Sequence, residues 1–349
     1  MQFHLTALFL FLLCSCCTPP TTTKTDIQPQ DTSIKTVVAL DSTINTTTTV
    51  ETSTQLTEDE YNTTDPIIAS DYQAKDVHFP NFDRSKIETQ LKQKVADEEP
   101  LIVHIFVPLC DNEHQGIVPT TASLGNGFSL RSNLYWATST GMKRYFKEKK
   151  HWKLLRSIKN VYQDSVVLER VIFKRTYPNK AVVYLVADAY RGDKMFETVN
   201  HFLRAASNNH TELQNLEDDR SISIHGAADL VVFNGHNGLF DLYYNQPKRW
   251  YNSTDRQKDV AIIACYASEY FERETMRAKA YPIVRAKGRL HPGAFVISAI
   301  IDDWAMLKSV EEMRLSAGKA YCEIHNCSIK TSKKLFYKGW RPENFNADF

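Results

Sequence analysis

The chain has little glycine, few cysteines and almost no net charge. Its 349 residues include 12 Gly and 7 Cys, and 42 basic residues are balanced by 41 acidic ones. Seven cysteines are too few for a small scaffold held together by disulfides. A net charge of +1 gives no compositional reason to expect nucleic-acid binding. The hydrophobic content of 42% predicts a globular protein, neither disordered nor fibrous, with one large domain or two ordinary ones.

The apolar run near the N-terminus is too short to cross a bilayer. Residues 5–13 are apolar, whereas a spanning helix needs about 20 residues, so the run has the length of a signal-peptide core. The next residues, LCSC, resemble the bacterial lipobox, in which a small residue precedes a lipidated cysteine. We therefore predict a lipoprotein signal peptide over residues 1–16, with Cys16 lipidated. An ordinary signal peptide with incidental cysteines is the alternative. The lipid anchor implies a membrane of the bacterial cell envelope, periplasmic or outer.

The segment that follows has the composition of a tether. Residues 18–64 contain 17 Thr and almost no periodic apolar pattern. Such a sequence cannot bury enough surface to offset the entropy lost on ordering. We predict a disordered Thr-rich linker over residues 17–80, which holds a folded domain, residues 81–349, away from the membrane.

The near-zero net charge conceals two segments of opposite sign. Residues 18–100 contain 7 basic and 15 acidic residues, whereas residues 101–349 contain 35 basic and 26 acidic ones. The basic excess of the second segment would favour anionic surfaces or acidic partners. A solvated surface of mixed charge is the other interpretation.

Beyond residue 100, apolar runs alternate with helical patterns. Strand-like runs cover residues 101–107, 166–174, 181–187, 230–233, 260–264 and 294–301, and helical patterns cover residues 84–96, 132–149, 195–206 and 303–320. Buried runs separated by helices predict an α/β fold, a three-layer sandwich with a mostly parallel sheet and helices on both faces. The few glycines form neither G-x-G-x-x-G after the first strand nor a Walker pattern, so nothing supports nucleotide binding.

Polar and nucleophilic residues follow three of the predicted strands. In open α/β sheets, chemistry gathers at the carboxyl ends of the strands. The run at 101–107 leads into Cys110, Asp111 and Asn112. The run at 230–233 leads into NGHNG, which contains His236, and the run at 260–264 leads into Cys265. An imidazole can take the proton of a nearby thiol, which then becomes a nucleophile. Glycines beside the histidine give a substrate room to approach and leave backbone N–H groups for an oxyanion. We therefore expect His236 and Cys265 to face each other across this edge of the sheet.

The two blocks DLVVFNGHNG and DVAIIACYASEYF resemble those of the clan CD cysteine peptidases: caspases, legumains, gingipains and clostripain. In that clan, one hydrophobic block ends in His-Gly and the next ends in Ala-Cys. The resemblance implies a caspase-like (caspase–hemoglobinase) fold, with His236 as the catalytic histidine and Cys265 as the nucleophile. It also implies an oxyanion site formed by backbone N–H groups near Asn237, Gly238 and Cys265. Asn237 stands where the clan usually has glycine. The segment PLCDNEHQGIVP with NLYW resembles an uncharacterised group of bacterial lipoprotein-like proteins, which implies no activity.

The resemblance implies an exported cysteine peptidase that cleaves peptide or amide bonds. Cys265 would attack and His236 would protonate the leaving amine, with no metal or organic cofactor and with a peptide or protein as substrate. One alternative is a non-catalytic envelope lipoprotein that uses the same fold for binding or scaffolding. Another is a different α/β scaffold in which the two residues never meet. Substrate residue, activation by cleavage and oligomeric state do not follow from the sequence.

Further polar residues lie after predicted strands and are expected to line a substrate pocket. They are Cys110, Asp111, Asn112, Asp188, Arg191 and Asp302. Each also has a structural interpretation. Cys110 could pair with Cys265 in a disulfide, which would silence the nucleophile. Asp111 and Asn112 would cap the turn that follows them, the loop at 188–193 would connect a strand to a helix, and residues 302–303 would begin a helix.

The remaining cysteines form a late pair. Cys322 and Cys327 are close in sequence and belong to an exported chain, so we predict a disulfide between them. His325 lies between them, which makes a metal site the alternative. Three ligands within six residues lack the paired spacing of known zinc folds, and we predict no metal.

Overall fold

The computed structural model describes residues 83–216, 220–241, 249–252 and 254–340. The predicted signal peptide, its lipidation site Cys16 and the predicted tether lie outside the described residues. None of the helices in these described ranges has the length and apolar character that crossing a membrane requires.

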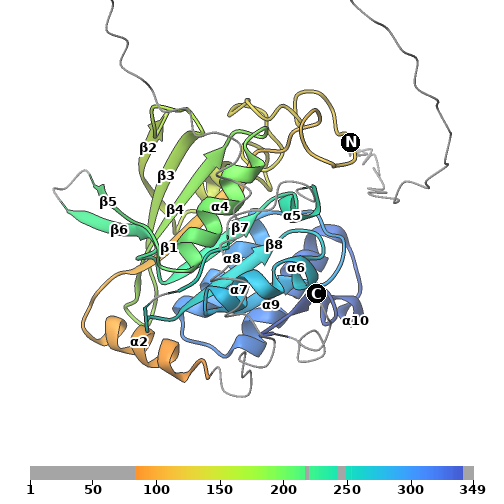
Figure 1. Ribbon diagram of the computed structural model, residues 1–349. Helices are drawn as coiled ribbons and strands as arrows, with labels where there is room; N and C mark the ends of the chain where they lie inside the picture. The colour runs from red at the N-terminus through yellow and green to blue at the C-terminus, as the bar shows by residue number, and fades with distance from the viewer. Residues whose placement is uncertain (1–82, 217–219, 242–248, 253, 341–349) are drawn as a thin grey trace, which may run out of the picture. The chain divides into compact units, whose positions relative to one another are not determined.

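An eight-stranded sheet forms the centre of the fold (Figure 1). Its order is β10-β9-β8-β7-β1-β4-β3-β2. The strands are β1 (Leu101–Pro108), β2 (Lys153–Lys159), β3 (Val167–Thr176), β4 (Val182–Tyr190), β7 (Leu230–Asn234), β8 (Lys258–Ile263), β9 (Ala280–Ala286) and β10 (Phe336–Tyr337). Strands β4, β1, β7, β8 and β9 pair in parallel, while β2, β3 and β10 are antiparallel to their neighbours. A separate antiparallel pair consists of β5 (Thr211–Asn215) and β6 (Ser221–His225). The predicted α/β fold with a mostly parallel sheet is confirmed.

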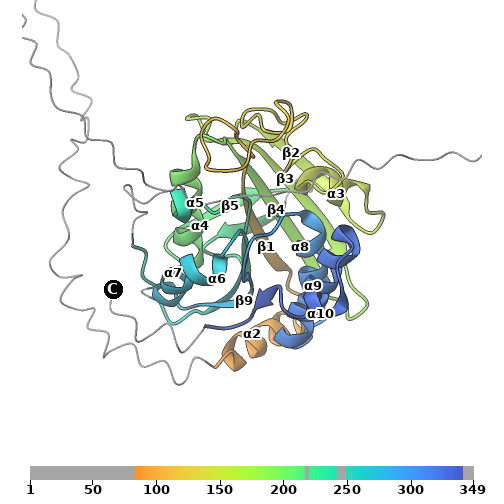
Figure 2. The same ribbon diagram turned by 90° about the vertical axis from the view of Figure 1, so that its right-hand side faces the viewer.

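Helices cover both faces of this sheet. One face carries α4 (Met195–Ala206), α6 (Ala267–Tyr270) and α7 (Glu272–Arg277), and the other carries α8 (Ala294–Ala305) and α9 (Val310–His325) (Figures 1 and 2). The remaining helices are α2 (Ser85–Ala96), α3 (Met142–Glu148), α5 (Gly238–Asp241) and α10 (Ile329–Ser332). Phe233 of β7 packs against Phe202 of α4 and Phe271 beside α7, with ring centroids 5.5 and 5.6 Å apart. Every residue of β1, β7 and β8 is buried, as the interior of a layered sheet requires.

The predicted strand over residues 294–301 is wrong, because this segment belongs to helix α8. Ten of its twelve residues are buried, so the helix is apolar on nearly every side. A short continuous apolar run does not by itself distinguish a buried strand from a buried helix. The helix predicted from residue 303 is therefore misplaced as well. Helix α9 begins only after Ser309, whose side chain accepts from the Glu312 N–H in a capping box.

The predicted helix over residues 132–149 is wrong in its first half. Only α3 is helical, and the preceding residues form turns held by the side chain of Asn133. Its amide donates to the carbonyls of Cys110 (2.8 Å) and Asn126 (2.9 Å), and its oxygen accepts from the Cys110 N–H (3.1 Å). Asparagine side chains compete with backbone groups in this way, which disfavours a helix.

Strand β9, which contains Pro282, was not predicted from the sequence. Proline lacks the N–H that a central strand donates and is found at edges or bulges. Here the pairing of β8 with β9 shifts register between Val260 and Ala261, and Pro282 is the partner of Val260 at that irregularity. The irregular pairing accommodates a proline in an interior strand.

The described domain begins at an anchored helix. Arg84 precedes α2 and donates to both carboxylate oxygens of Asp259 in β8, at 2.8 and 2.6 Å. The indole N–H of Trp304 donates to the same carboxylate at 2.9 Å. All three side chains are buried. One carboxylate thus attaches α2 and α8 to the sheet.

Candidate functional site

The two residues of the predicted dyad follow neighbouring parallel strands. Strands β7 and β8 are paired up to Asn234 and Ile263, so their carboxyl ends lie at one edge of the sheet (Figure 1). His236 follows β7 and is 8% exposed, while Cys265 follows β8 and is half-buried. The structure places both predicted residues at this edge.

Asn237 connects the loop that carries the histidine to the loop that carries the cysteine. Its side-chain amide donates to the backbone carbonyl of Cys265 at 2.6 Å, and its oxygen accepts from the Leu239 N–H at 3.1 Å. Asn237 itself is 1% exposed. The residue that differs from the clan pattern therefore holds the two loops in a fixed relation.

The backbone turns sharply immediately after Cys265. Tyr266 has a φ of 52° in the left-handed region, and its N–H donates to the carbonyl of Gly288 at 3.0 Å. A non-glycine residue in this conformation costs about 1–2 kcal/mol, and such residues concentrate at functional sites. The Cys265 thiol donates to the carbonyl of Leu290 at 3.5 Å. Cys265 thus lies at a strand-to-helix turn, held against the segment after β9.

The glycines beside His236 make room for neighbouring elements. A Cβ at Gly235 would lie 2.7 Å from Cγ of Pro108 at the end of β1. A Cβ at Gly238 would lie 2.4 Å from Cγ of Met195 at the start of α4. We expected these glycines to give a substrate room to approach. The close packing against Pro108 and Met195 is an alternative reason for glycine at both positions.

Two of the predicted pocket residues after β1, Asp111 and Asn112, hold their own loop. The carboxylate of Asp111 accepts from the Glu113 N–H and from Nδ1 of His114, both at 2.9 Å. The side chain of Asn112 bonds to both backbone groups of Thr120, at 2.8 and 3.0 Å. These contacts match the capping interpretation.

Cys110 is buried after β1 and belongs to no disulfide in the structure, and the same holds for the thiol of Cys265. The disulfide between them, considered from the sequence, is not formed. Cys322 and Cys327 form the disulfide that the sequence predicts.

Arg191 and Asp302, both expected near the pocket, lie at opposite edges of the sheet. Arg191 follows β4, pairs with Asp193 at 2.7 Å and lies 4.9 Å from the ring centroid of Phe128. Asp302 is part of α8 and pairs with Arg175 at 2.5 Å. Because β3 is antiparallel to β4, its last residues, including Arg175, lie at the edge away from the dyad. Asp302 therefore lies outside the candidate site. Its segment is helix α8, not the predicted strand whose end would have placed it there.

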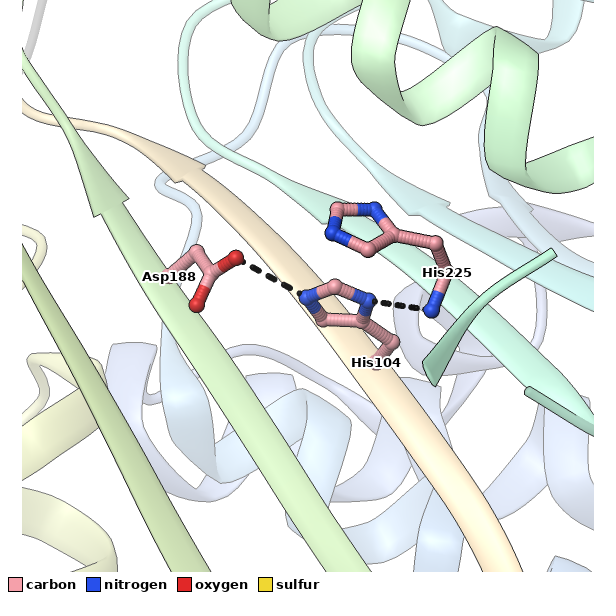
Figure 3. A group of neighbouring side chains, drawn as sticks. All are labelled: His104, Asp188 and His225. Atoms are coloured by element: carbon pink, nitrogen blue, oxygen red, sulfur yellow. Dashed lines mark hydrogen bonds and ion pairs between the residues drawn. The ribbon is translucent and has the colours of Figure 1, made fainter. Parts of the chain in front are cut away.

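Asp188 lies within β4, inside a buried polar cluster that was not predicted from the sequence (Figure 3). Its carboxylate accepts from Nε and Nη2 of Arg170 at 2.7 and 2.8 Å, and from Nε2 of His104 at 3.0 Å. Nδ1 of His104 accepts from the backbone N–H of His225 at 3.1 Å, which fixes the proton of the imidazole on Nε2. Arg170 also pairs with Glu212. The available signals were a histidine inside the otherwise apolar strand β1 and an arginine directly before the apolar residues 171–173 of β3.

Two triads within the cluster bring ligand-type atoms within 4.8 Å of one another: His104, Asp188 and His225, and His210, Glu212 and His225. In the first triad, both nitrogens of His104 and both oxygens of Asp188 already have protein partners. In the second, Glu212 is bonded to Arg170, Tyr162 and His225. A metal cation would also face the buried guanidinium of Arg170. These residues therefore fit a closed ion network better than a metal centre.

Burial sets the protonation of the histidines in this cluster. Desolvation lowers the pKa of His225 to about 3, and it also lowers the pKa of His104, whose charge would repel His225. The ordinary value for both is 6.5. Near neutral pH, both imidazoles are therefore neutral in the folded protein.

Acid should destabilise the domain through His225. In the unfolded chain this side chain gains its proton near pH 6.5, whereas the folded protein gains it only near pH 3. The folded state thus binds fewer protons between these values, and stability present above pH 6.5 is lost as the pH falls. At pH 5 the loss from this one residue is roughly 2 kcal/mol. Urea unfolding at pH 7.5 and pH 5 measures it, and His225→Gln should reduce the difference by about that amount. Equal stability of the wild-type chain at both pH values would contradict the prediction.

The chain was also compared with known proteins. No family model, curated protein or solved structure matches it. Its function is therefore inferred from its own residues and from the geometry of the edge where β7 and β8 end.

Proposed function

We propose that this chain is a cysteine-dependent hydrolase of peptide or amide bonds, in which His236 and Cys265 act together. The observation that carries the proposal is the hydrogen bond from Asn237 to the Cys265 carbonyl, at 2.6 Å. It joins the histidine and cysteine loops at the ends of adjacent parallel strands. The same order of blocks is found in the clan CD peptidases that the sequence resembles, and a caspase-like fold for the domain is part of this proposal.

The chemistry needs the thiol to give up its proton. In the resting arrangement Sγ of Cys265 donates to the carbonyl of Leu290 at 3.5 Å. When a substrate binds, the thiol turns away from Leu290 and His236 accepts the proton. The thiolate attacks the carbonyl carbon, and backbone N–H groups of Asn237 and Gly238 stabilise the resulting oxyanion. The imidazolium then protonates the leaving amine, and water hydrolyses the thioester to regenerate the thiol.

The protein would act at the bacterial cell envelope. Its substrate would be a peptide or protein, and the lipid on Cys16 would keep it at a membrane. A non-catalytic lipoprotein on the same fold is the second candidate. The hydrogen bond from the Cys265 thiol to the Leu290 carbonyl favours this non-catalytic candidate, because it turns the thiol toward the main chain.

Thiol alkylation distinguishes the two candidates. We expect iodoacetamide to modify Cys265 at neutral pH, and His236→Ala to slow this modification at least about tenfold, because the imidazole generates the thiolate. His151→Ala is the matched control, since His151 is exposed and belongs to neither loop. Peptide mapping by mass spectrometry separates Cys265 from the buried Cys110. Hydrolysis of a mixed peptide library should be lost in Cys265→Ala. An unreactive Cys265, or equal rates in the two histidine variants, would refute the hydrolase and favour the binding protein.

A further inference from the structure

A cavity of about 210 Å³ has Leu290 in its lining, and the carbonyl of Leu290 accepts from the thiol of Cys265. Its lining comes from the segment after β9, from α9 and from the residues around the start of β10, namely Lys287, Gly288, Arg289, Leu290, Tyr321, Lys334, Leu335 and Phe336. Two hydrogen bonds join this lining to the cysteine loop. The thiol of Cys265 donates to Leu290 at 3.5 Å, and the N–H of Tyr266 donates to Gly288 at 3.0 Å. The cavity and the proposed nucleophile thus share one wall.

The shape of the cavity is fixed by main-chain bonds and aromatic packing. The Lys287 N–H donates to the Leu335 carbonyl at 2.9 Å, which joins two of the walls. The hydroxyl of Tyr321 accepts from the His291 N–H at 3.1 Å. The rings of Tyr321 and the buried Phe336 lie 6.5 Å apart, centroid to centroid. Together with Leu290 and Leu335, these residues give the cavity apolar walls.

The charged residues of the lining are all positive. They are Lys287, Arg289 and Lys334, and no Asp or Glu among the described residues lines the cavity. Lys287 and Lys334 are exposed, and neither forms an ion pair with any residue that the structure describes. Lys338, a few residues further along the chain, is instead neutralised by Glu311 at 3.0 Å. Lys287 and Lys334 beside apolar walls create a local positive potential that attracts anions.

We propose that this cavity binds a carboxylate of the substrate, carried on a short apolar stem. The stem packs against Leu335 and Phe336, while Lys287 and Lys334 attract the charge. The inference rests on the proposed hydrolase, because the shared wall places the bound group next to Cys265. The carboxylate belongs either to an acidic side chain or to a chain terminus, and the experiment distinguishes these two sources.

Binding is measured with the full chain carrying Cys265→Ala, so that no peptide is consumed. Three fluorescent peptides of otherwise equal sequence serve as probes: one with a central Glu and blocked ends, one with Gln and blocked ends, and one with Gln and a free C-terminal carboxylate. We expect one of the two carboxylate peptides to bind at least about tenfold tighter than the blocked Gln peptide at low salt. Raising the salt concentration should reduce this preference. The preferred peptide identifies the source of the carboxylate.

Charge reversal locates the binding site. Lys287→Glu with Lys334→Glu should abolish the preference for the carboxylate. The matched control is Lys147→Glu with Lys150→Glu, which changes the net charge equally at exposed positions outside the cavity and should retain the preference. Circular dichroism confirms that both double variants are folded. Equal binding of all three peptides, or equal loss in both double variants, would overturn the cavity assignment.

The wild-type chain separates this inference from the proposed function. Selective binding without cleavage would support the cavity and refute the hydrolase. Cleavage of all three peptides with equal kcat/KM would support the hydrolase and overturn the cavity assignment.

Discussion

Replacing Arg170 by methionine should lower the free energy of unfolding by about 3–5 kcal/mol. The guanidinium is 0% exposed and donates to both oxygens of Asp188, at 2.7 and 2.8 Å, as well as to Glu212. Its removal leaves the fully buried carboxylate of Asp188 and the partly buried one of Glu212 without their main cation. Breaking a buried ion pair on one side costs more than the pair contributes, because the remaining charge has no compensation. Urea unfolding of the full chain at pH 7.5 measures the effect.

An exposed ion pair provides the control for Arg170. Arg144 and Glu148 form an i,i+4 pair at 2.7 Å in α3, with side chains 55% and 54% exposed. Arg144→Met should cost no more than about 0.5 kcal/mol, since solvent screens such pairs. If Arg170→Met were no more destabilising than Arg144→Met, the cluster would not contribute to stability as its geometry implies.

The sequence predicts those parts of the fold in which the apolar pattern of a single segment determines its secondary structure. Residues 195–206 have a helical apolar pattern and form α4 over the same range. The apolar run after residue 100 forms β1, which is buried throughout. In both segments, the apolar pattern of consecutive residues matches the burial in the structure. The element can therefore be predicted without knowing which distant residues it contacts.

The segments that the sequence mispredicts depend on distant partners. The apolar residues 294–301 suit a strand or a helix equally, and the choice is made by burial in the layer beside α9. Pro282 disfavours a strand at residues 280–286 unless the irregular pairing of β8 with β9 is known. The buried cluster around Arg170 also depends on distant partners. An arginine directly before the apolar residues 171–173 indicates a buried partner, but its partners Asp188 and Glu212 belong to other strands.

The candidate site could be predicted in position but not in detail. Consecutive parallel strands put their carboxyl ends at one edge, so His236 and Cys265 were expected there from strand order. The link from Asn237 to the Cys265 carbonyl depends on the precise approach of two loops, which no periodicity encodes. The cavity is made by segments around residues 288, 321 and 335, whose association follows from β9 and β10, neither of which was predicted.

The second large effect should come from Asp259→Ala. This carboxylate accepts two bonds from Arg84, at 2.8 and 2.6 Å, and one from the Trp304 indole at 2.9 Å. The substitution leaves a buried guanidinium without its main counter-charge and an indole N–H without its acceptor. We expect a loss of about 3–5 kcal/mol in the free energy of unfolding. Asp255→Ala is the matched control, because Asp255 is an exposed residue just before the same strand, and its loss should stay within about 0.5 kcal/mol.

Hydrogen exchange shows which helices are stabilised by the bonds to Asp259. Arg84 precedes α2, and Trp304 lies near the end of α8, so both helices depend on one carboxylate of β8. Helix α2 buries only Ile87 and Leu91, whereas α8 is buried on nearly every side. We therefore expect Asp259→Ala to remove protection from the amides of residues 85–96 well before those of residues 294–305. Equal protection of α2 in the Asp259→Ala and Asp255→Ala chains would contradict this anchoring role. Loss confined to α2 would mean that packing alone suffices to hold α8, while the start of the domain depends on a single ion pair.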